Sequence, residues 1–180
     1  MASRKGYVIV VKELLKVPEI IVNDDHNALH AASEYDHDEV VKELLNAPGI
    51  NVNARDIHGH TPLYVAPKEG FTEVVSELLK APGIMVNDNC NSNPLHVASE
   101  HDHHQVVREL LKAPGMNVNA RDICGHTPLY AASRKGFNKV VNELLKAPGI
   151  MVNYNCNSNP LHVASEHDHH QIVRELLKAL

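Results

Sequence analysis

The sequence has few aromatic residues, which make up 4% of its 180 residues, and it lacks tryptophan. This scarcity argues against a large central core built on bulky rings, so leucine, valine, isoleucine and alanine must supply the buried volume. Long apolar runs are missing as well. The segment YVIVV at 7–11 is far shorter than the roughly 18–20 residues that cross a bilayer. We therefore predict a chain that does not enter a membrane.

Basic residues and paired cysteines are also scarce. With 17 lysines and arginines against 22 acids, the formal net charge is −5, which argues against nonspecific nucleic-acid binding. The cysteines are odd in number, have no CxxC spacing and follow no signal-like N-terminus, and the chain has no N-x-[ST] sequon. These features predict a reduced, cytoplasmic protein. The cysteines are Cys90, Cys124 and Cys156.

The chain is built from internal repeats. A pair of leucines recurs in segments such as VVKELL and VVRELL, beginning at Leu14, Leu44, Leu78, Leu110, Leu144 and Leu176. The intervals are 30, 34, 32, 34 and 32 residues, so the repeat length alternates. Residues 54–114 also match residues 120–180 at 50 of 61 positions, which indicates that repeats were duplicated in pairs.

Each unit has a helix–turn–helix pattern. Thr61 stands at a helix N-cap and Pro62 at the first helical position, where its missing N–H costs no hydrogen bond. Gly70 then supplies a tight turn. The segment FTEVVSELLKA at 71–81 has its valines and leucines on one face of a second helix. The turn-rich segment at 53–60 predicts a hairpin-like loop between units.

This pattern resembles the ankyrin repeat over nearly the whole chain. The resemblance is carried by DIHGHTPLYVAPKEGFTEVVSELLKAPGIMVN at 56–87 and DICGHTPLYAASRKGFNKVVNELLKAPGIMVN at 122–153. These segments fit the family's D-x-x-G-x-T-P-L-H/Y, A-A-x-x-G, V-V-x-x-L-L and V-N landmarks. The resemblance implies an all-α solenoid of stacked antiparallel helix pairs, with hairpins projecting from one edge and stability summed over neighbouring interfaces.

We expect one solenoid domain over residues 1–180, with units that alternate between 34 and 32 residues. Every completed unit carries an APG insertion after its second helix, and alternate units have a shorter hairpin. Long and short fingers, as we name these hairpins, should therefore alternate along the edge. The expected units are a partial repeat at 1–23 and repeats at 24–53, 54–87, 88–119, 120–153 and 154–180.

A histidine-rich run, HVASEHDHHQ, stands at 96–105 and again at 162–171. In the repeat register, His96 and His103 fall on framework positions of the two helices. Asp102 takes the place of the turn glycine, and aspartate tolerates a left-handed backbone there.

The same run offers an alternative function, a metal- or pH-responsive module. The pair His96-x4-His101 fits the H-x3–5-H spacing of zinc sites, and imidazoles titrate near neutral pH. A structural zinc site needs four ligands, however, and the two runs lie too far apart to share an ion. We therefore predict no metal or other cofactor. The weak candidate ligands are His96, His101, His104, His162, His167 and His170.

Two further possible activities involve the cysteines and the asparagines. Cys124 and His126 place a thiol near an imidazole, but in an exposed hairpin where nothing excludes water, so we predict no enzymatic activity. The asparagines of the VN pairs resemble those that an asparaginyl hydroxylase modifies in some ankyrin proteins. We predict instead that an asparagine before the hairpin shapes the turn through side-chain to backbone bonds. The asparagines of these pairs are Asn53, Asn87, Asn119 and Asn153.

The resemblance implies a partner-binding face on the finger tips and the outer side of the first helices. We therefore predict a non-catalytic protein-interaction module or adaptor. Tyr154 is the one aromatic among the tips, and we expect a protein partner whose acidic groups meet Arg121, Arg134 and Lys135 beside it. The predicted partner-binding residues are Arg55, His58, His60, Lys68, Arg121, His126, Arg134, Lys135, Tyr154, Glu100, His101, Glu166 and His167.

The two ends of the chain lead to a prediction about self-association. Residues 2–16 match residues 132–146, so the chain begins inside a repeat, and it stops just after a second helix. Repeat proteins need polar capping units, and none is visible here. We expect end-to-end association, seen in light scattering as a mass that rises above 19.9 kDa with concentration. A monomeric mass at high concentration would contradict it.

Overall fold

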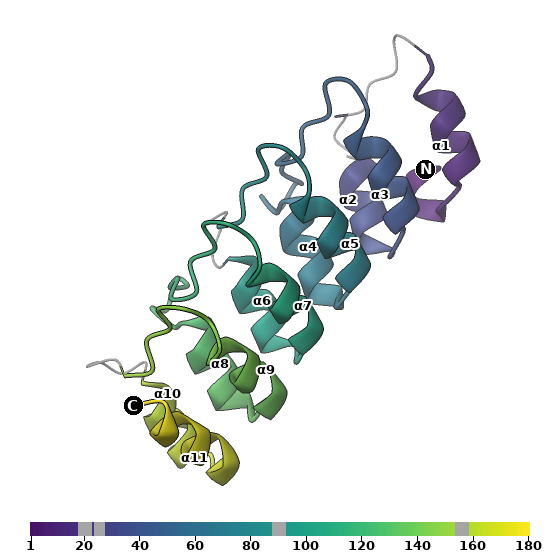
Figure 1. Ribbon diagram of the computed structural model, residues 1–180. Helices are drawn as coiled ribbons and strands as arrows, with labels where there is room; N and C mark the ends of the chain where they lie inside the picture. Colours follow the sequence, from purple (N-terminus) through teal and green to yellow (C-terminus); the bar gives the residue numbers. More distant parts are fainter. Residues whose placement is uncertain (18–22, 24–27, 88–92, 154–158) are drawn as a thin grey trace.

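The computed structural model describes residues 1–17, 23, 28–87, 93–153 and 159–180. Short helices pair antiparallel and stack side by side into an elongated solenoid, with loops along one edge (Figure 1). The described residues contain no strand. The predicted all-α repeat solenoid is confirmed.

The helices form two layers, because first helices pack on first helices and second helices on second helices. The first helices are α2 (Ala28–Glu34), α4 (Pro62–Glu69), α6 (Pro94–Glu100), α8 (Pro128–Lys135) and α10 (Pro160–Glu166). The second helices are α1 (Val8–Leu14), α3 (Asp38–Leu45), α5 (Thr72–Leu79), α7 (His104–Leu110), α9 (Asn138–Leu144) and α11 (His170–Lys178). A 3-10 turn, η1 (Ser3–Lys5), precedes α1.

Buried leucines run through the whole stack between the two layers. They belong to one continuous cluster, and the described helices contact mainly their own partner and the neighbouring pairs, so the core is a chain of local interfaces. Full burial of one leucine contributes roughly 1.5–3 kcal/mol. The leucines with at most 2% exposure are Leu29, Leu44, Leu63, Leu78, Leu95, Leu110, Leu129, Leu144 and Leu176.

The turn between the two helices of a pair needs a left-handed residue. In the partial first repeat and in the long-finger repeats this residue is glycine, with φ of 67° at Gly6, 85° at Gly70 and 80° at Gly136. In the other repeats it is aspartate, with φ of 58° at Asp36, 61° at Asp102 and 57° at Asp168. The predicted replacement of glycine by aspartate is confirmed.

The histidine that follows each turn aspartate packs against the preceding repeat and lies within hydrogen-bond distance of its backbone. The Nε2 atom of His103 lies 3.0 Å from the carbonyl oxygen of Lys68, and a Cβ atom added to Gly70 would stand 2.6 Å from the His103 ring. The ring therefore occupies the space that a side chain at Gly70 would need. The same arrangement joins His37 to Arg4 and Gly6, and His169 to Arg134 and Gly136.

The VN asparagines link each repeat to the next one. The side-chain amide of Asn53 donates to the carbonyl of Gly83 at 2.8 Å, and its oxygen accepts from the N–H of Met85 at 2.8 Å. The predicted side-chain to backbone bonds are thus present at Asn53, Asn87 and Asn119, but they hold the loop of the following repeat rather than the hairpin next to the asparagine. The further bridges join Asn23 to Gly49 and Asn51, Asn87 to Gly115 and Asn117, and Asn119 to Gly149 and Met151.

Ion pairs link neighbouring repeats along the second helices. Arg108 on α7 donates to both carboxylate oxygens of Glu143 on α9, at 2.7 Å and 3.3 Å. The hydrogen bond from Arg108, helped by Lys146, lowers the pKa of Glu143 to about 2 although burial opposes ionisation. Weaker counterparts join Lys12 to Glu43 and Lys42 to Glu77.

Apolar side chains are exposed on the first and last of the second helices. Ile9 on α1 is 78% exposed and Leu177 on α11 is 55% exposed. End-to-end association stays a prediction. No described helix is long and apolar enough to span a membrane.

The contact between histidine and glycine predicts different effects of the same substitution at two left-handed glycines. Gly136 and Gly149 have φ of 80° and 74°, but an added Cβ meets the His169 ring only at Gly136 and meets nothing within 4 Å at Gly149. Gly149→Ala should lower the free energy of unfolding by about 1 kcal/mol through backbone strain. Gly136→Ala should cost a further ~1–3 kcal/mol because the ring must move. Urea unfolding measures both, and equal losses would contradict the packing role of His169.

Candidate functional site

The long fingers at Asp56–His60 and Asp122–His126 are rigid turns held by an aspartate. The Asp122 Oδ1 atom accepts the N–H groups of Cys124 and His126, both at 2.8 Å. The Asp122 N–H donates to the carbonyl of His126 at 2.9 Å and closes the loop. Asp56 makes the same bonds to His58 and His60. Burial opposes ionisation of Asp56, but the N–H groups of His60 and His58 outweigh it and lower the pKa of that carboxyl.

The histidine that ends each long finger is wedged between the finger and the first helix that follows. The His126 ring stacks on Tyr130 with 4.2 Å between ring centroids, and its Nδ1 lies 3.6 Å from Asp122 Oδ2. His60 stacks on Tyr64 at 4.3 Å in the same way. Both residues are half-buried, so part of each remains accessible to solvent.

A groove of about 460 Å³ lies between α2, the first long finger and α4. It brings together the predicted partner-binding residues His58, His60 and Lys68, and it adds the acidic residues Glu34 and Asp56. Its lining is His30, Glu34, Asp56, His58, His60, Tyr64, Val65, Lys68 and Glu69.

The arginines of the long fingers form hydrogen bonds within their own loops. Arg55 donates to the carbonyl of Gly59 at 2.8 Å, and Arg121 donates to that of Gly125 at 3.2 Å. Both side chains are exposed. The guanidinium group that bonds to the loop is therefore the same group that is predicted to contact a partner.

The other predicted partner-binding residues cluster near the C-terminal ends of the first helices. Arg134 and Lys135 are exposed at the end of α8, as are Glu166 and His167 around the end of α10. Glu100 is half-buried at the end of α6, and His101 next to it is exposed. Tyr154 lies outside the described residues, as do Cys90 and Cys156.

The histidine run is largely framework, and the structure does not support the weak zinc pair considered for it. His96 is fully buried, with Nδ1 2.8 Å from Asn93 Oδ1 and Nε2 2.9 Å from the carbonyl of His126. Neither nitrogen is available to an ion. His30 occupies the same position two repeats earlier, and its Nε2 lies 2.8 Å from the carbonyl oxygen of His60.

The remaining histidine candidates do not gather around a metal position. His101 Nδ1 lies 2.9 Å from the carbonyl of Val97, and His167 Nδ1 lies 3.0 Å from that of Val163. These rings therefore cap the ends of α6 and α10. The candidates His104, His162 and His170 join no group of three ligand side chains in the part of the chain that the structure describes.

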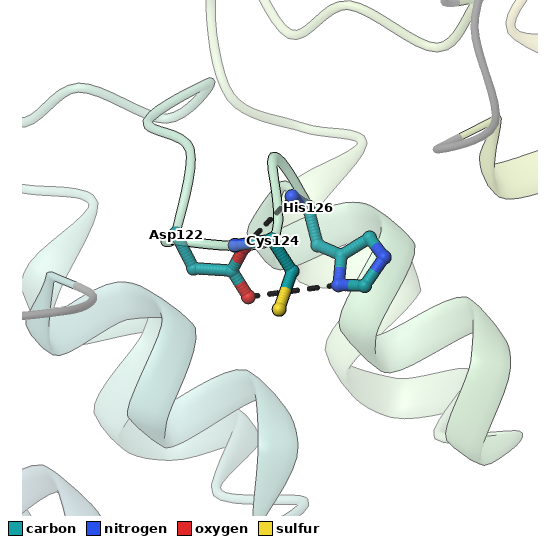
Figure 2. A group of neighbouring side chains, drawn as sticks. All are labelled: Asp122, Cys124 and His126. Carbon is teal, nitrogen blue, oxygen red and sulfur yellow. Dashed lines mark hydrogen bonds and ion pairs between the residues drawn. The ribbon is translucent and has the colours of Figure 1, made fainter.

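Sequence reasoning missed one cluster. Asp122, Cys124 and His126 place a carboxylate oxygen, a thiol sulfur and a ring nitrogen within 4.8 Å of one another (Figure 2). From the sequence we expected only a thiol near an imidazole, without the carboxylate. The D-x-C-x-H spacing in the sequence was the signal that could have indicated this cluster. The hydrogen bonds that Asp122 accepts shape a turn in which these alternate side chains lie on the same side.

Comparisons with known proteins agree with this architecture. A family model described as "Ankyrin repeats (3 copies)" matches residues 1–56, 55–122 and 112–179. The chain is also similar to the crystal structure of the ankyrin repeat domain of Bcl-3, described as a unique member of the IkappaB protein family. The TM-score is 0.86 with 27% identity, over 99% of this chain and 83% of that one. No curated protein matches the sequence. These findings give no support to the histidine-rich alternative.

The burial of His96 predicts how stability depends on pH. Desolvation lowers the pKa of His96 below its ordinary 6.5, although the bond to the His126 carbonyl opposes this. As pH falls below 6.5, this histidine is therefore protonated in the unfolded chain while it is still neutral in the folded chain. Over that range the free energy of unfolding falls by up to about 1.4 kcal/mol per pH unit for this group. We expect the free energy of unfolding to fall between pH 7.5 and 5.5, and less steeply in His96→Leu. An identical slope in that variant would contradict the assignment.

Proposed function

Because the chain belongs to the ankyrin-repeat family, we propose that it is a non-catalytic interaction module or adaptor that binds a protein partner through its fingers and first helices. The observation that carries the proposal is an isoleucine at the same place on both long fingers, with Ile57 87% and Ile123 78% exposed. Each stands on a turn that its aspartate already holds, so folding gains nothing from this apolar surface.

The surroundings of the isoleucines fit the edge of a protein interface. Interfaces combine an apolar centre with a polar rim. The groove that Asp56 and His58, the chain neighbours of Ile57, help to line supplies such a rim with Lys68, Glu69 and Glu34. The opposite layer is less suited to a partner, because ion pairs such as Arg108 with Glu143 already join its neighbouring helices.

The charge of the two long-finger repeats suggests the chemistry of the partner. Glu69 of the first is replaced by Lys135 in the second, where Arg134 is also exposed. We propose a partner segment with an apolar residue that meets Ile123 and acidic residues that meet Arg134 and Lys135. A cytoplasmic location is part of the proposal, and the free thiol of Cys124 suits a reducing compartment.

Two charge reversals of the same kind test the proposal. Arg134→Glu changes the proposed face, and Lys139→Glu changes the exposed back of α9. In quantitative pull-downs from the source cells, Arg134→Glu and Ile123→Asp should each reduce capture of a common set of proteins about tenfold, which corresponds to ~1.4 kcal/mol.

Lys139→Glu should leave that set unchanged, and direct binding of one purified member should repeat the order of the variants. Equal losses for Arg134→Glu and Lys139→Glu would show a nonspecific charge effect. Full capture by Ile123→Asp and Arg134→Glu would exclude this face.

A further inference from the structure

We propose that Asp122, Cys124 and His126, on the second long finger, form a binding site for a divalent cation of the zinc class. Thiolate, imidazole and carboxylate are the three side-chain groups that zinc takes from proteins. Here one of each converges, with all ligand atoms within 4.8 Å of one another (Figure 2). The inference does not depend on the proposed partner binding.

Two of the three ligands are held before an ion arrives. Asp122 Oδ1 is fixed by the N–H groups of Cys124 and His126, and Oδ2 then lies on the side of the His126 ring. The ring is fixed by its stacking on Tyr130. Nδ1 and Oδ2 are 3.6 Å apart, a spacing that fits two ligands of one tetrahedral ion with bonds of about 2.0–2.1 Å.

The third ligand needs only a small movement. Cys124 is exposed, so its side chain turns about one bond without displacing core atoms. On binding, the thiol gives its proton to solvent and the sulfur binds as thiolate, while the imidazole binds in its neutral form. Thiolate and carboxylate together balance the two positive charges of the ion. The exposed side of the finger leaves the fourth position to water.

The first long finger is a matched comparison inside the same chain. It has the same aspartate bonds, and its histidine lies at the same 3.6 Å from the carboxylate, as His60 Nδ1 to Asp56 Oδ2. It differs at one ligand position, where His58 stands in place of Cys124. Among the described residues this finger forms no such three-ligand group.

Cobalt(II) titration of the full chain tests the site, because a thiolate bound to cobalt gives a charge-transfer absorption band. A background with Cys90→Ser and Cys156→Ser leaves one thiol, kept reduced with a phosphine. We expect one equivalent of cobalt with the thiolate band, displaced by zinc. Cys124→Ser should remove the band and weaken zinc affinity at least tenfold in calorimetry, with urea unfolding unchanged.

Two further variants locate the site on the finger. Asp122→Asn keeps the oxygen that accepts the turn bonds but loses the charge, so zinc affinity should fall severalfold. His58→Cys should give the first finger a second site and raise the cobalt stoichiometry from one to two.

Absence of the thiolate band in the single-thiol background would overturn the proposal. Zinc affinity that Cys124→Ser leaves unchanged would also overturn it, since the ion would then bind to other histidines. A stoichiometry that stays at one in His58→Cys would overturn the role given to the geometry of the finger.

Discussion

The structure depends on the bridge between an asparagine of one repeat and the loop of the next. In a solenoid each unit touches only its neighbours, so the contact at one interface sets the position of everything beyond it. Asn53 satisfies both the carbonyl of Gly83 and the N–H of Met85, which fixes the loop on two sides. The APG insertion supplies that carbonyl through a left-handed glycine, and the bridge therefore explains why the insertion recurs in every completed unit.

The alternation of two kinds of repeat follows from a second contact at the same interfaces. A histidine after a turn aspartate needs a neighbour without a side chain, and Gly70 and Gly136 provide it for His103 and His169. Unlike repeats are thus complementary in pairs, which is consistent with duplication by two units. The histidine-rich run takes part in these contacts between repeats, since His96 and His103 each lie against a backbone carbonyl of a neighbouring repeat.

Sequence patterns predict local features well and contacts across repeats poorly. The left-handed aspartate at 102 was predictable because positive φ is a property of one residue and its type. The hydrogen-bond partners of Asn53 were not predictable from the sequence, since an asparagine can equally form a bond within its own turn. The burial of His96 requires the carbonyl of His126, 30 residues later, and so depends on how the next finger is placed. The cluster on the second long finger required knowing which turn the aspartate makes.

In the long fingers, some positions hold the fold through their side chains, and others hold it only through the backbone, so that their side chains can vary. At the position of His58 and Cys124 the turn uses only the backbone N–H, which any residue except proline supplies. The side chain there can change from imidazole to thiol with no loss of a framework bond. At His60 and His126 the ring itself is packed on a tyrosine, and the residue is the same in both fingers. New chemistry is therefore expected at the middle of a finger, beside a histidine and an aspartate that folding already places.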